Sequence, residues 1–423
     1  MKIKKIVMPY QEVLALPAEK RKKPKKPPLF FRTLIRLLSV GEMKKVNFSY
    51  KTIGMEKLRK HEPCLILMNH SCFTDLMIAS EIFFPRPLNI VCTSDGFVGK
   101  RWLMRNLGCI PTAKFVTDMA LVRDMLYTVS ELKSSVLMYP EASYSFDGTA
   151  TSLPASVGKM LKLLNVPVIM VRTYGAFLHD PLYNNLQIRQ TDISANVEYL
   201  LSPEQIAELS VQELNRILND RFSFDNFRWQ QKNGVIIDEP FRADYLNRVL
   251  YKCPHCQTEG KMLGKGITIT CEACGKGYEL TEDGYLKALD GDAAFTHIPD
   301  WYRWERECVR KEIEDGSYRL NIPVKICIMK NTKAIYEVGT GTLEHSKDGF
   351  HLTGCDGALD YRQKPAASYS LYSDYYWYEI GDMICIGKPD LLYYCFPTEC
   401  GDVVAKTRMA AEELYKAERK VKV

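Results

Sequence analysis

Between about residue 46 and residue 240, short hydrophobic runs alternate with longer amphipathic stretches. The short runs are typical of buried strands, and they occupy residues 64–68, 88–91, 135–139 and 168–171. Between these runs, residues 119–133 and residues 155–164 each have the pattern of a helix. Because alternating strands and helices are typical of an α/β domain, we expect a mostly parallel sheet flanked by helices over residues 46–245.

The hydrophobic pattern changes after residue 290. A helical stretch over residues 299–314 ends at a glycine, and residues 324–328 then alternate between apolar and polar side chains as a strand does. Further strand-like runs follow, and residues 402–420 form a charged helical segment. We expect residues 291–423 to be a small β-rich, barrel-like module with a terminal helix.

The first 45 residues combine a basic run with an amphipathic helix. Residues 20–28 are almost all lysine, arginine or proline, and apolar residues dominate the ten that follow. Arg32 and Arg36 lie four residues apart on one side of this predicted helix. We expect residues 1–45 to contact membrane lipids, with the apolar face in the acyl boundary and the arginines and lysines at anionic headgroups. The alternative is a solvated tail that leads into a core helix.

Charge is distributed unevenly along the chain. Residues 1–60 contain 17 Lys/Arg against 4 Asp/Glu, whereas the whole chain has a net charge of only +6, so the rest of the chain is acidic. No apolar run reaches the length of a membrane span, and the first residues lack the pattern of a signal peptide. We therefore expect a cytoplasmic protein, peripheral on the inner face of the membrane, with its cysteines reduced.

The segment directly after the first buried run contains a possible acid–base pair. His70 and Asp75 lie five residues apart where a predicted strand turns into a helix. An aspartate there can hold one ring nitrogen and leave the other as a base for a hydroxyl acceptor. By itself this spacing favours a structural His–Asp pair over a catalytic one. Cys72, between the two, is expected to be a small buried thiol rather than a nucleophile.

Four blocks over residues 50–175 resemble the glycerolipid acyltransferase family, which includes the 1-acylglycerol-3-phosphate acyltransferases. Asn69, His70 and Asp75 match its Asn-His-x4-Asp block. Gly108 precedes Lys114 by six residues, as the glycine precedes a basic residue in the second block. Residues 139–145 match the third block, and residues 166–169 match the fourth.

The resemblance implies direct acyl transfer from a thioester donor, either acyl-CoA or acyl-ACP, to the hydroxyl of a lysophospholipid resembling lysophosphatidic acid. It makes His70 the general base and Asp75 its orienting acid. It also implies substrate-binding roles for further residues of the blocks, namely Asn69, Lys114, Glu141, Ser143 and Tyr144. The acyl-carrier protein becomes a possible partner.

One departure from the family pattern bears on the acceptor. The third block of the family contains an arginine that resembles a phosphate clamp, and here Tyr144 stands in its place. Lys114 can bind phosphate as a point charge but lacks the planar fork of a guanidinium. Either the acceptor carries a substituted phosphate, or other basic residues such as Lys159 or Arg172 hold it.

Residues 246–290 contain two C-x2-C pairs. Cys253 and Cys256 form the first pair, Cys271 and Cys274 form the second, and fourteen residues separate the two pairs. Two such pairs supply four thiolates for a tetrahedral structural zinc and leave no open position for catalysis. We therefore predict a zinc ribbon.

Other functions were weighed against this interpretation. Acidic residues offset the lysines around the cysteine pairs, so the ribbon lacks the one-sided basic face of a nucleic-acid reader. A serine hydrolase is disfavoured because the chain has no Gly-x-Ser-x-Gly elbow. Two alternatives stay open: an acyltransferase for a different lipid acceptor, and a non-catalytic lipid-binding scaffold.

Overall fold

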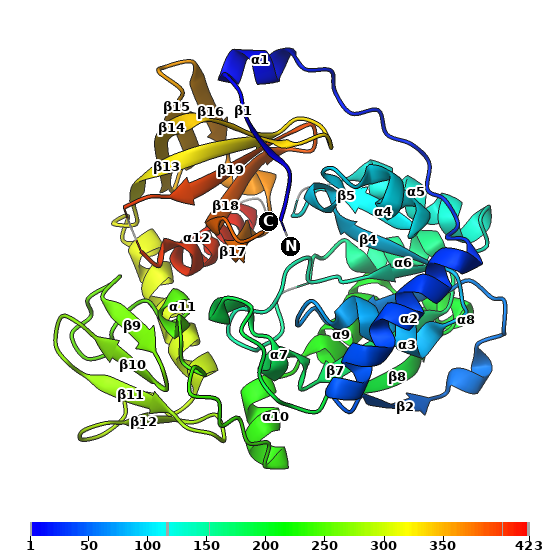
Figure 1. Cartoon of the computed structure of the whole chain (residues 1–423), viewed down its shortest axis with the longest axis horizontal. Coiled ribbons are helices and arrows are strands. Elements are labelled where there is room, and N and C mark those ends of the chain that lie inside the picture. Colours follow the sequence, from blue (N-terminus) through cyan, green and yellow to red (C-terminus); the bar gives the residue numbers. More distant parts are fainter. Residues whose placement is uncertain (1, 116–117, 152, 400, 421–423) are drawn as a thin grey trace.

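The structure is a computed structural model that describes residues 2–115, 118–151, 153–399 and 401–420. Two large sheets lie beside each other, and a small four-stranded sheet lies next to them (Figure 1). The chain starts on the C-terminal sheet, crosses to the other large sheet, passes through the small sheet and returns.

The sheet that follows the N-terminal segment has seven strands in the order β2-β8-β7-β3-β6-β4-β5. Their bounds are Ser49–Ile53 (β2), Leu65–Met68 (β3), Leu88–Thr93 (β4), Cys109–Thr112 (β5), Ser135–Met138 (β6), Val168–Tyr174 (β7) and Ser194–Leu201 (β8). The pairing of β7 with β8 is antiparallel, and the other neighbours along this order are parallel. The sheet is therefore mixed, and its central strands β7, β3 and β6 run in the same direction.

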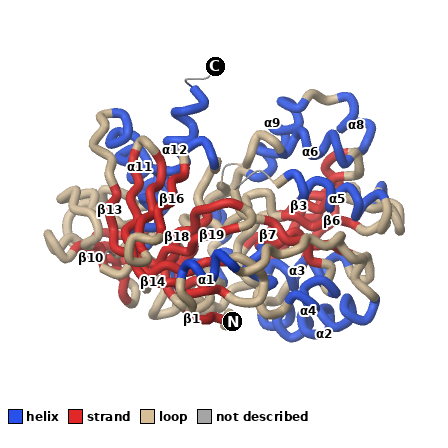
Figure 2. Tube along the Cα trace, turned by 90° about the horizontal axis from the view of Figure 1, so that it is seen from above, coloured by secondary structure: helices blue, strands red, loops and turns tan. Residues whose placement is uncertain are grey.

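Helices cover both faces of this sheet (Figure 2). One face carries α2 (Leu29–Lys45), α3 (Asp75–Phe83) and α4 (Arg101–Asn106), and the other carries α5 (Met119–Ser130), α6 (Val157–Leu164), α8 (Pro203–Glu208) and α9 (Val211–Phe222). Each strand contributes side chains to the cores on both faces of the sheet, because successive side chains point to opposite faces. In β3, Leu65 and Leu67 join the core under α5, α6 and α9, whereas Ile66 and Met68 join the core under α2 and α3.

Helix α2 is longer than expected and is turned the other way. Arg32 donates to the carbonyl of Pro85, and Arg36 Nη2 donates to Glu81 Oε1 of α3 at 2.6 Å. The expectation that these two arginines face lipid headgroups is therefore wrong, because they bind the α3 side of the helix. Four large apolar side chains of α2 are exposed instead, by 56% to 70%: Leu29, Phe30, Leu37 and Leu38.

The two C-x2-C pairs lie beside a small antiparallel sheet in the order β12-β11-β10-β9. Its strands are Met262–Lys265 (β9), Thr268–Cys271 (β10), Gly277–Leu280 (β11) and Leu286–Ala288 (β12). Helix α7 (Ala176–His179) lies between β7 and β8 in the sequence, and α10 (Asn226–Asn233) lies between the seven-stranded sheet and this ribbon. Helix α11 (Ile298–Glu314) then leads into the C-terminal sheet.

The C-terminal sheet has the order β16-β15-β14-β13-β19-β18-β17 and ends in helix α12 (Val403–Lys420). Its strands are Leu320–Met329 (β13), Ile335–Ser346 (β14), Gly349–Gly354 (β15), Leu359–Gln363 (β16), Tyr372–Trp377 (β17), Gly381–Lys388 (β18) and Leu391–Pro397 (β19). Neighbours along this order pair antiparallel. The pairings confirm a β-rich module with a terminal helix, and its closure into a barrel stays a prediction.

The N-terminal residues join this C-terminal sheet. Strand β1 (Lys5–Val7) pairs in parallel with β14, and Lys5 Nζ lies 2.7 Å from Glu337 Oε2. Helix α1 (Tyr10–Ala15) follows and packs into the same core. This finding differs from the expectation that residues 1–45 form one membrane segment, because β1 and α1, within residues 5–15, build on the β module.

One hydrophobic core links the ribbon, α11 and the C-terminal sheet to the segments that follow β6 and β7 of the seven-stranded sheet. It contains Tyr278 of the ribbon, Trp301 of α11, Ile326 of β13 and Phe146 and Phe177 from the seven-stranded part. The two large sheets are therefore packed against each other through shared side chains rather than joined by a free linker.

None of the helices in the described ranges combines the length and the apolar character that crossing a membrane requires.

Candidate active site

The candidate residues meet where the central strands end. Strands β7, β3 and β6 are neighbours and run in the same direction, so their carboxyl ends lie at one edge of the sheet. Asn69 and His70 follow β3, the segment from Tyr139 follows β6, and Thr173 lies near the end of β7. Parallel sheets bind ligands at this edge.

Asn69 fixes the start of the loop after β3. It is fully buried, and its Oδ1 accepts the Thr173 backbone N–H at 2.8 Å. Its Nδ2 donates to Ser71 Oγ at 3.0 Å. The amide thus ties the loop to β7 on both sides of His70, which makes it a positioning residue.

His70 and Asp75 form the predicted pair. His70 Nδ1 lies 2.9 Å from Asp75 Oδ2, and the same oxygen accepts the backbone N–H of Ser71 at 2.8 Å. Asp75 is buried at the first turn of α3, so its carboxylate is held by the loop it supports. The contact at Nδ1 leaves Nε2 without a hydrogen-bond partner among the residues that the structure describes. An imidazole protonated at Nδ1 presents a basic lone pair at Nε2.

The environment of His70 keeps its ring neutral. Burial lowers the pKa of His70, the hydrogen bond and charge of Asp75 work against this, and the charge of Lys114 lowers it further. The side chain is nevertheless 16% exposed, so its free nitrogen is accessible. A pKa below the ordinary value leaves the base form dominant at neutral pH.

Two tyrosines enclose the imidazole. The ring centroid of His70 lies 4.1 Å from that of Tyr139 and 4.0 Å from that of Tyr144. Tyr144, which takes the place of the third-block arginine, therefore packs on the base and offers no cation. Sequence analysis did not single out Tyr139, although its place at the start of the third block was the available signal.

Glu141 connects the loop of the base to the third block. Its Oε2 accepts the backbone N–H of His70 at 3.0 Å, and its Oε1 accepts the backbone N–H of Thr151 at 2.8 Å. It is 2% exposed, and burial raises its pKa to about 7 although both backbone hydrogen bonds oppose the rise. Glu141 thus positions the backbone of His70.

Lys114 faces the C-terminal sheet. Its Nζ lies 4.3 Å from the ring centroid of Tyr372 in β17. Burial lowers the pKa of Lys114, and the charges of Asp374 and Asp95 oppose that change. Burial also raises the pKa of Asp374 to about 7, although Lys114 lowers it. Lys114 therefore belongs to a buried polar cluster between the two large sheets.

The other proposed cations lie elsewhere. Lys159 is exposed on α6. Thr173 of β7 contacts Asn69 through its side chain. Arg172 is the preceding residue of the strand, so its side chain points to the opposite face of the sheet. There it donates to the carbonyl of Arg221. Neither residue joins the group around His70.

A residue that the sequence did not single out reaches the third block. Arg408 Nη1 of α12 donates to Ser143 Oγ at 3.2 Å, and Ser143 Oγ donates to the carbonyl of Tyr144 at 3.2 Å. No local spacing could have revealed this contact, because 265 residues separate Arg408 from Ser143.

Cys72 lies close to the pair but has the character of a buried thiol. It is 2% exposed, and burial together with the charge of Asp75 raises the pKa of its thiol well above the ordinary value. A thiol that stays protonated is a poor nucleophile. The expectation that Cys72 is a packing residue agrees with this.

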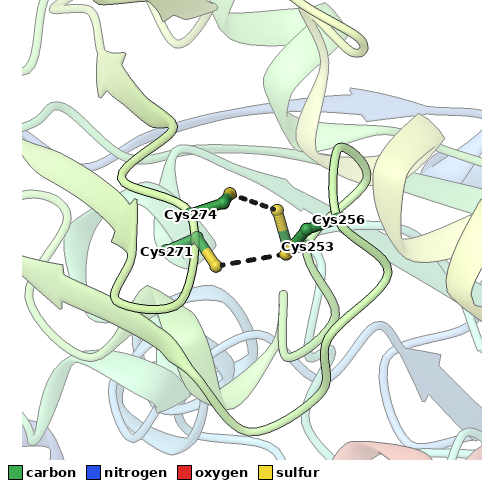
Figure 3. Close-up of side chains that lie close together, drawn as sticks. All are labelled: Cys253, Cys256, Cys271 and Cys274. Carbon is green, nitrogen blue, oxygen red and sulfur yellow. Dashed lines mark hydrogen bonds between the residues drawn. The ribbon is translucent and has the colours of Figure 1, made fainter.

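The four cysteines of the ribbon form a second site (Figure 3). Their sulfur atoms all lie within 4.8 Å of one another, with Cys253 and Cys274 at 3.8 Å and Cys256 and Cys271 at 3.7 Å. These separations exceed a disulfide bond and match the edge of about 3.8 Å expected when four sulfurs surround an ion at about 2.3 Å. The donor set can therefore hold a metal ion.

The electrostatics of His70 predict its titration. We expect the imidazole to titrate below pH 6.5, because burial disfavours the charged form. Asp75→Asn removes the carboxylate that favours the imidazolium, so the midpoint moves to lower pH still. Nitrogen-15 NMR of histidine-labelled protein measures both, with the His70 signal assigned by its loss in His70→Gln. A midpoint that rises in Asp75→Asn contradicts this account of the pair.

Comparison with known proteins gives the family of this part of the chain. Residues 49–173, from β2 into β7, match the family model described as Acyltransferase. Among solved structures, the crystal structure of the 1-acyl-sn-glycerophosphate (LPA) acyltransferase, PlsC, from Thermotoga maritima is similar, with 14% identity and a TM-score of 0.38. That likeness covers 45% of this chain and 76% of the other. No curated protein sequence matches the chain significantly. The family match agrees with the assignment made from the four sequence blocks: residues 49–173 of this chain are an acyltransferase domain.

Proposed function

We propose that this acyltransferase moves a fatty acyl group from acyl-CoA or acyl-ACP to the hydroxyl of a lysophospholipid resembling lysophosphatidic acid. The observation that carries the proposal is the Asp75-oriented imidazole of His70, with Nε2 free, at the strand ends of an acyltransferase domain. A hydroxyl is a weak nucleophile at neutral pH and needs a base of this kind.

The reaction needs one base and no acyl-enzyme. The acceptor hydroxyl gives its proton to His70 Nε2 while its oxygen attacks the thioester carbonyl carbon. The tetrahedral intermediate then expels the thiolate, and the imidazolium returns the proton to that sulfur. The Asp75 carboxylate stabilises the imidazolium while it exists. Glu141 and Asn69 keep the loop of His70 in place through backbone hydrogen bonds.

Replacement of the base tests the reaction. We expect His70→Ala to lower kcat/KM by about 10²- to 10⁴-fold, the contribution of a positioned general base. Purified protein is incubated with palmitoyl-CoA or palmitoyl-ACP and a panel of lysophospholipids, and products are identified by mass. His351→Ala, in β15 on the C-terminal sheet, serves as the matched control.

The outcomes separate the competing functions. Acylation of lysophosphatidic acid by the parent and by His351→Ala, lost in His70→Ala, supports the proposal. Acylation of another lipid instead identifies a different acceptor, which the tyrosine at position 144 leaves open. Undiminished turnover in a folded His70→Ala protein rejects the mechanism. If the parent binds lipid but acylates no acceptor, the result supports the alternative of a non-catalytic lipid-binding scaffold.

We also propose that the protein docks on an anionic membrane through α2 and α4. Phe30 of α2 is 70% exposed and Trp102 of α4 is 72% exposed, and the rings of Phe31 and Trp102 lie 5.8 Å apart, which joins the two helices into one apolar surface. The basic segment 20–26 lies beside it, since Arg105 donates to the carbonyl of Lys23. Apolar side chains next to lysines suit an anionic bilayer.

Vesicle flotation tests this docking surface. The double variant Phe30→Ser, Leu37→Ser should bind phosphatidylglycerol vesicles at least about tenfold more weakly than the parent, because each apolar side chain buried is worth about 1.5–3 kcal/mol. The control Leu163→Ser, Ile236→Ser removes equally exposed apolar residues elsewhere. Added salt should weaken parent binding through the lysines. Equal losses in both double variants contradict the location.

We propose zinc as the ion of the four-cysteine site. Cys253, Cys256, Cys271 and Cys274 would hold it with all four positions filled by sulfur, so zinc would join the two C-x2-C pairs and take no part in acyl transfer.

Metal analysis of the purified protein tests the zinc proposal. We expect about one zinc per chain, lost in Cys253→Ser together with a lower thermal midpoint, because a structural zinc contributes binding free energy to folding. Cys308→Ser, on α11 outside the cluster, should keep its zinc. A parent that contains no metal and melts at the same temperature with and without a chelator contradicts the assignment.

A further inference from the structure

The C-terminal helix reaches into the acyltransferase site. Helix α12 packs between α11 and the C-terminal sheet, and Arg408 lies in its buried face. Its side chain is 3% exposed, and its Nη1 donates to Ser143 Oγ of the third block at 3.2 Å. The Cζ atom lies 4.4 Å from the ring centroid of Phe146, which also belongs to the segment after β6.

Arg408 and Glu141, the residue that binds the backbone of His70, line the same small cavity. The cavity is lined by Arg408 and by Glu141, whose other carboxylate oxygen accepts the backbone N–H of His70. Thr151 and Ser370 add hydroxyl groups, and Lys416, whose side chain is 48% exposed and whose Nζ lies 2.8 Å from Glu413 Oε1, adds a second cation. The space holds about one water molecule in this structure, so a ligand enters by displacing that volume and moving Lys416.

The charges around the cavity leave the guanidinium available to an anion. Glu412 Oε1 accepts from Arg408 Nε at 3.3 Å, but Glu412 is also bound by Arg306 at 2.7 Å and by Ser370 Oγ at 2.6 Å. Burial works to raise the pKa of Glu412, and Arg306 and Arg408 outweigh it and lower the pKa to about 2. Glu412 is thus shared by two guanidinium groups, of which that of Arg306 also binds Glu413 at 3.3 Å. Glu141, with a pKa raised to about 7 by burial, does not fully cancel Arg408.

A guanidinium at this place compensates for what the third block lacks. Tyr144 packs on His70 and carries no charge, while Lys114 is held against β17. Arg408 approaches Ser143, the residue next to Tyr144, from another part of the chain. Its planar fork can bind two phosphate oxygens at once, which an ammonium group cannot.

We propose that Arg408 binds the phosphate group of the acceptor in place of the third-block arginine, so that the C-terminal β module supplies part of the acyltransferase site. This inference rests on the proposed function and adds to it the residue that recognises the headgroup. Under it, the β module and α12 are required for acceptor choice and not only for folding.

Acceptors with and without phosphate test the role of Arg408. For Arg408→Met we expect KM for lysophosphatidic acid to rise about 10- to 100-fold, the loss expected for a charged hydrogen-bond pair. With the monoacylglycerol of the same acyl chain, kcat/KM should stay within about threefold of the parent. Arg408→Lys, which keeps the charge and loses the fork, should fall between parent and Arg408→Met.

A control separates recognition from packing of the helix. Arg310→Met breaks the ion pair between α11 and Glu413 of α12 at 3.0 Å and does not line the cavity, so its KM for lysophosphatidic acid should match the parent. Equal losses with both acceptors in Arg408→Met, or an equal rise of KM in Arg310→Met, would show that Arg408 only holds the interface and would overturn the inference.

Binding of sn-glycerol 3-phosphate keeps this test independent of turnover. Calorimetry should show that the parent and Arg310→Met bind it and that Arg408→Met binds at least about tenfold more weakly, while none binds glycerol. If the parent acylates none of the acceptors, the proposed function fails and this measurement alone decides on Arg408. No binding to the parent, or equal binding to Arg408→Met, then overturns the inference.

Discussion

A carboxylate taken out of water needs hydrogen-bond donors, and the loop after β3 meets this need twice. Asp75 accepts the backbone N–H of Ser71, and Glu141 accepts that of His70. Each carboxylate comes from a different part of the domain, so the loop can satisfy both only in one conformation. That conformation presents the imidazole between two tyrosine rings with one nitrogen bound and the other open. The geometry of the base therefore follows from the burial of its neighbours.

The same requirement links the two large sheets. Asp95 follows β4 and is 1% exposed, and Tyr372 of β17 donates to its Oδ2 at 2.6 Å. Lys114 lies on the ring of that tyrosine, and Arg408 reaches the third block from α12. Polar groups of the acyltransferase domain are thus satisfied by the C-terminal module. Separation of the two parts would leave buried charges without partners, which is far more costly than the loss of surface contacts.

Much of this fold could be predicted from the sequence, and the exceptions have physical causes. Hydrophobic runs gave the strands β3, β4, β6 and β7 because burial on both faces leaves a local pattern. The pair His70–Asp75 and the four cysteines were found because each set is close in sequence. Periodicity shows that a helix has two faces but does not show which one turns inward, so the orientation of α2 was missed.

Arg408 was missed for a different reason. Its partner Ser143 is 265 residues away, and a single arginine in a charged helix resembles a solvated one. Only the packing of α12 under the C-terminal sheet removes it from water and points it at another domain. Contacts of this kind depend on tertiary structure and leave no trace in local composition.

The pairing of β1 with β14 has a consequence for the order in which the chain folds. Residues 5–7 are made more than three hundred residues before their partner at residues 335–337. Since domains fold as units during synthesis, the seven-stranded sheet can form before β14, the partner of β1, has been made. The addition of β1 is therefore a late step, because residues 5–7 can pair only after the strand at residues 335–337 has been made.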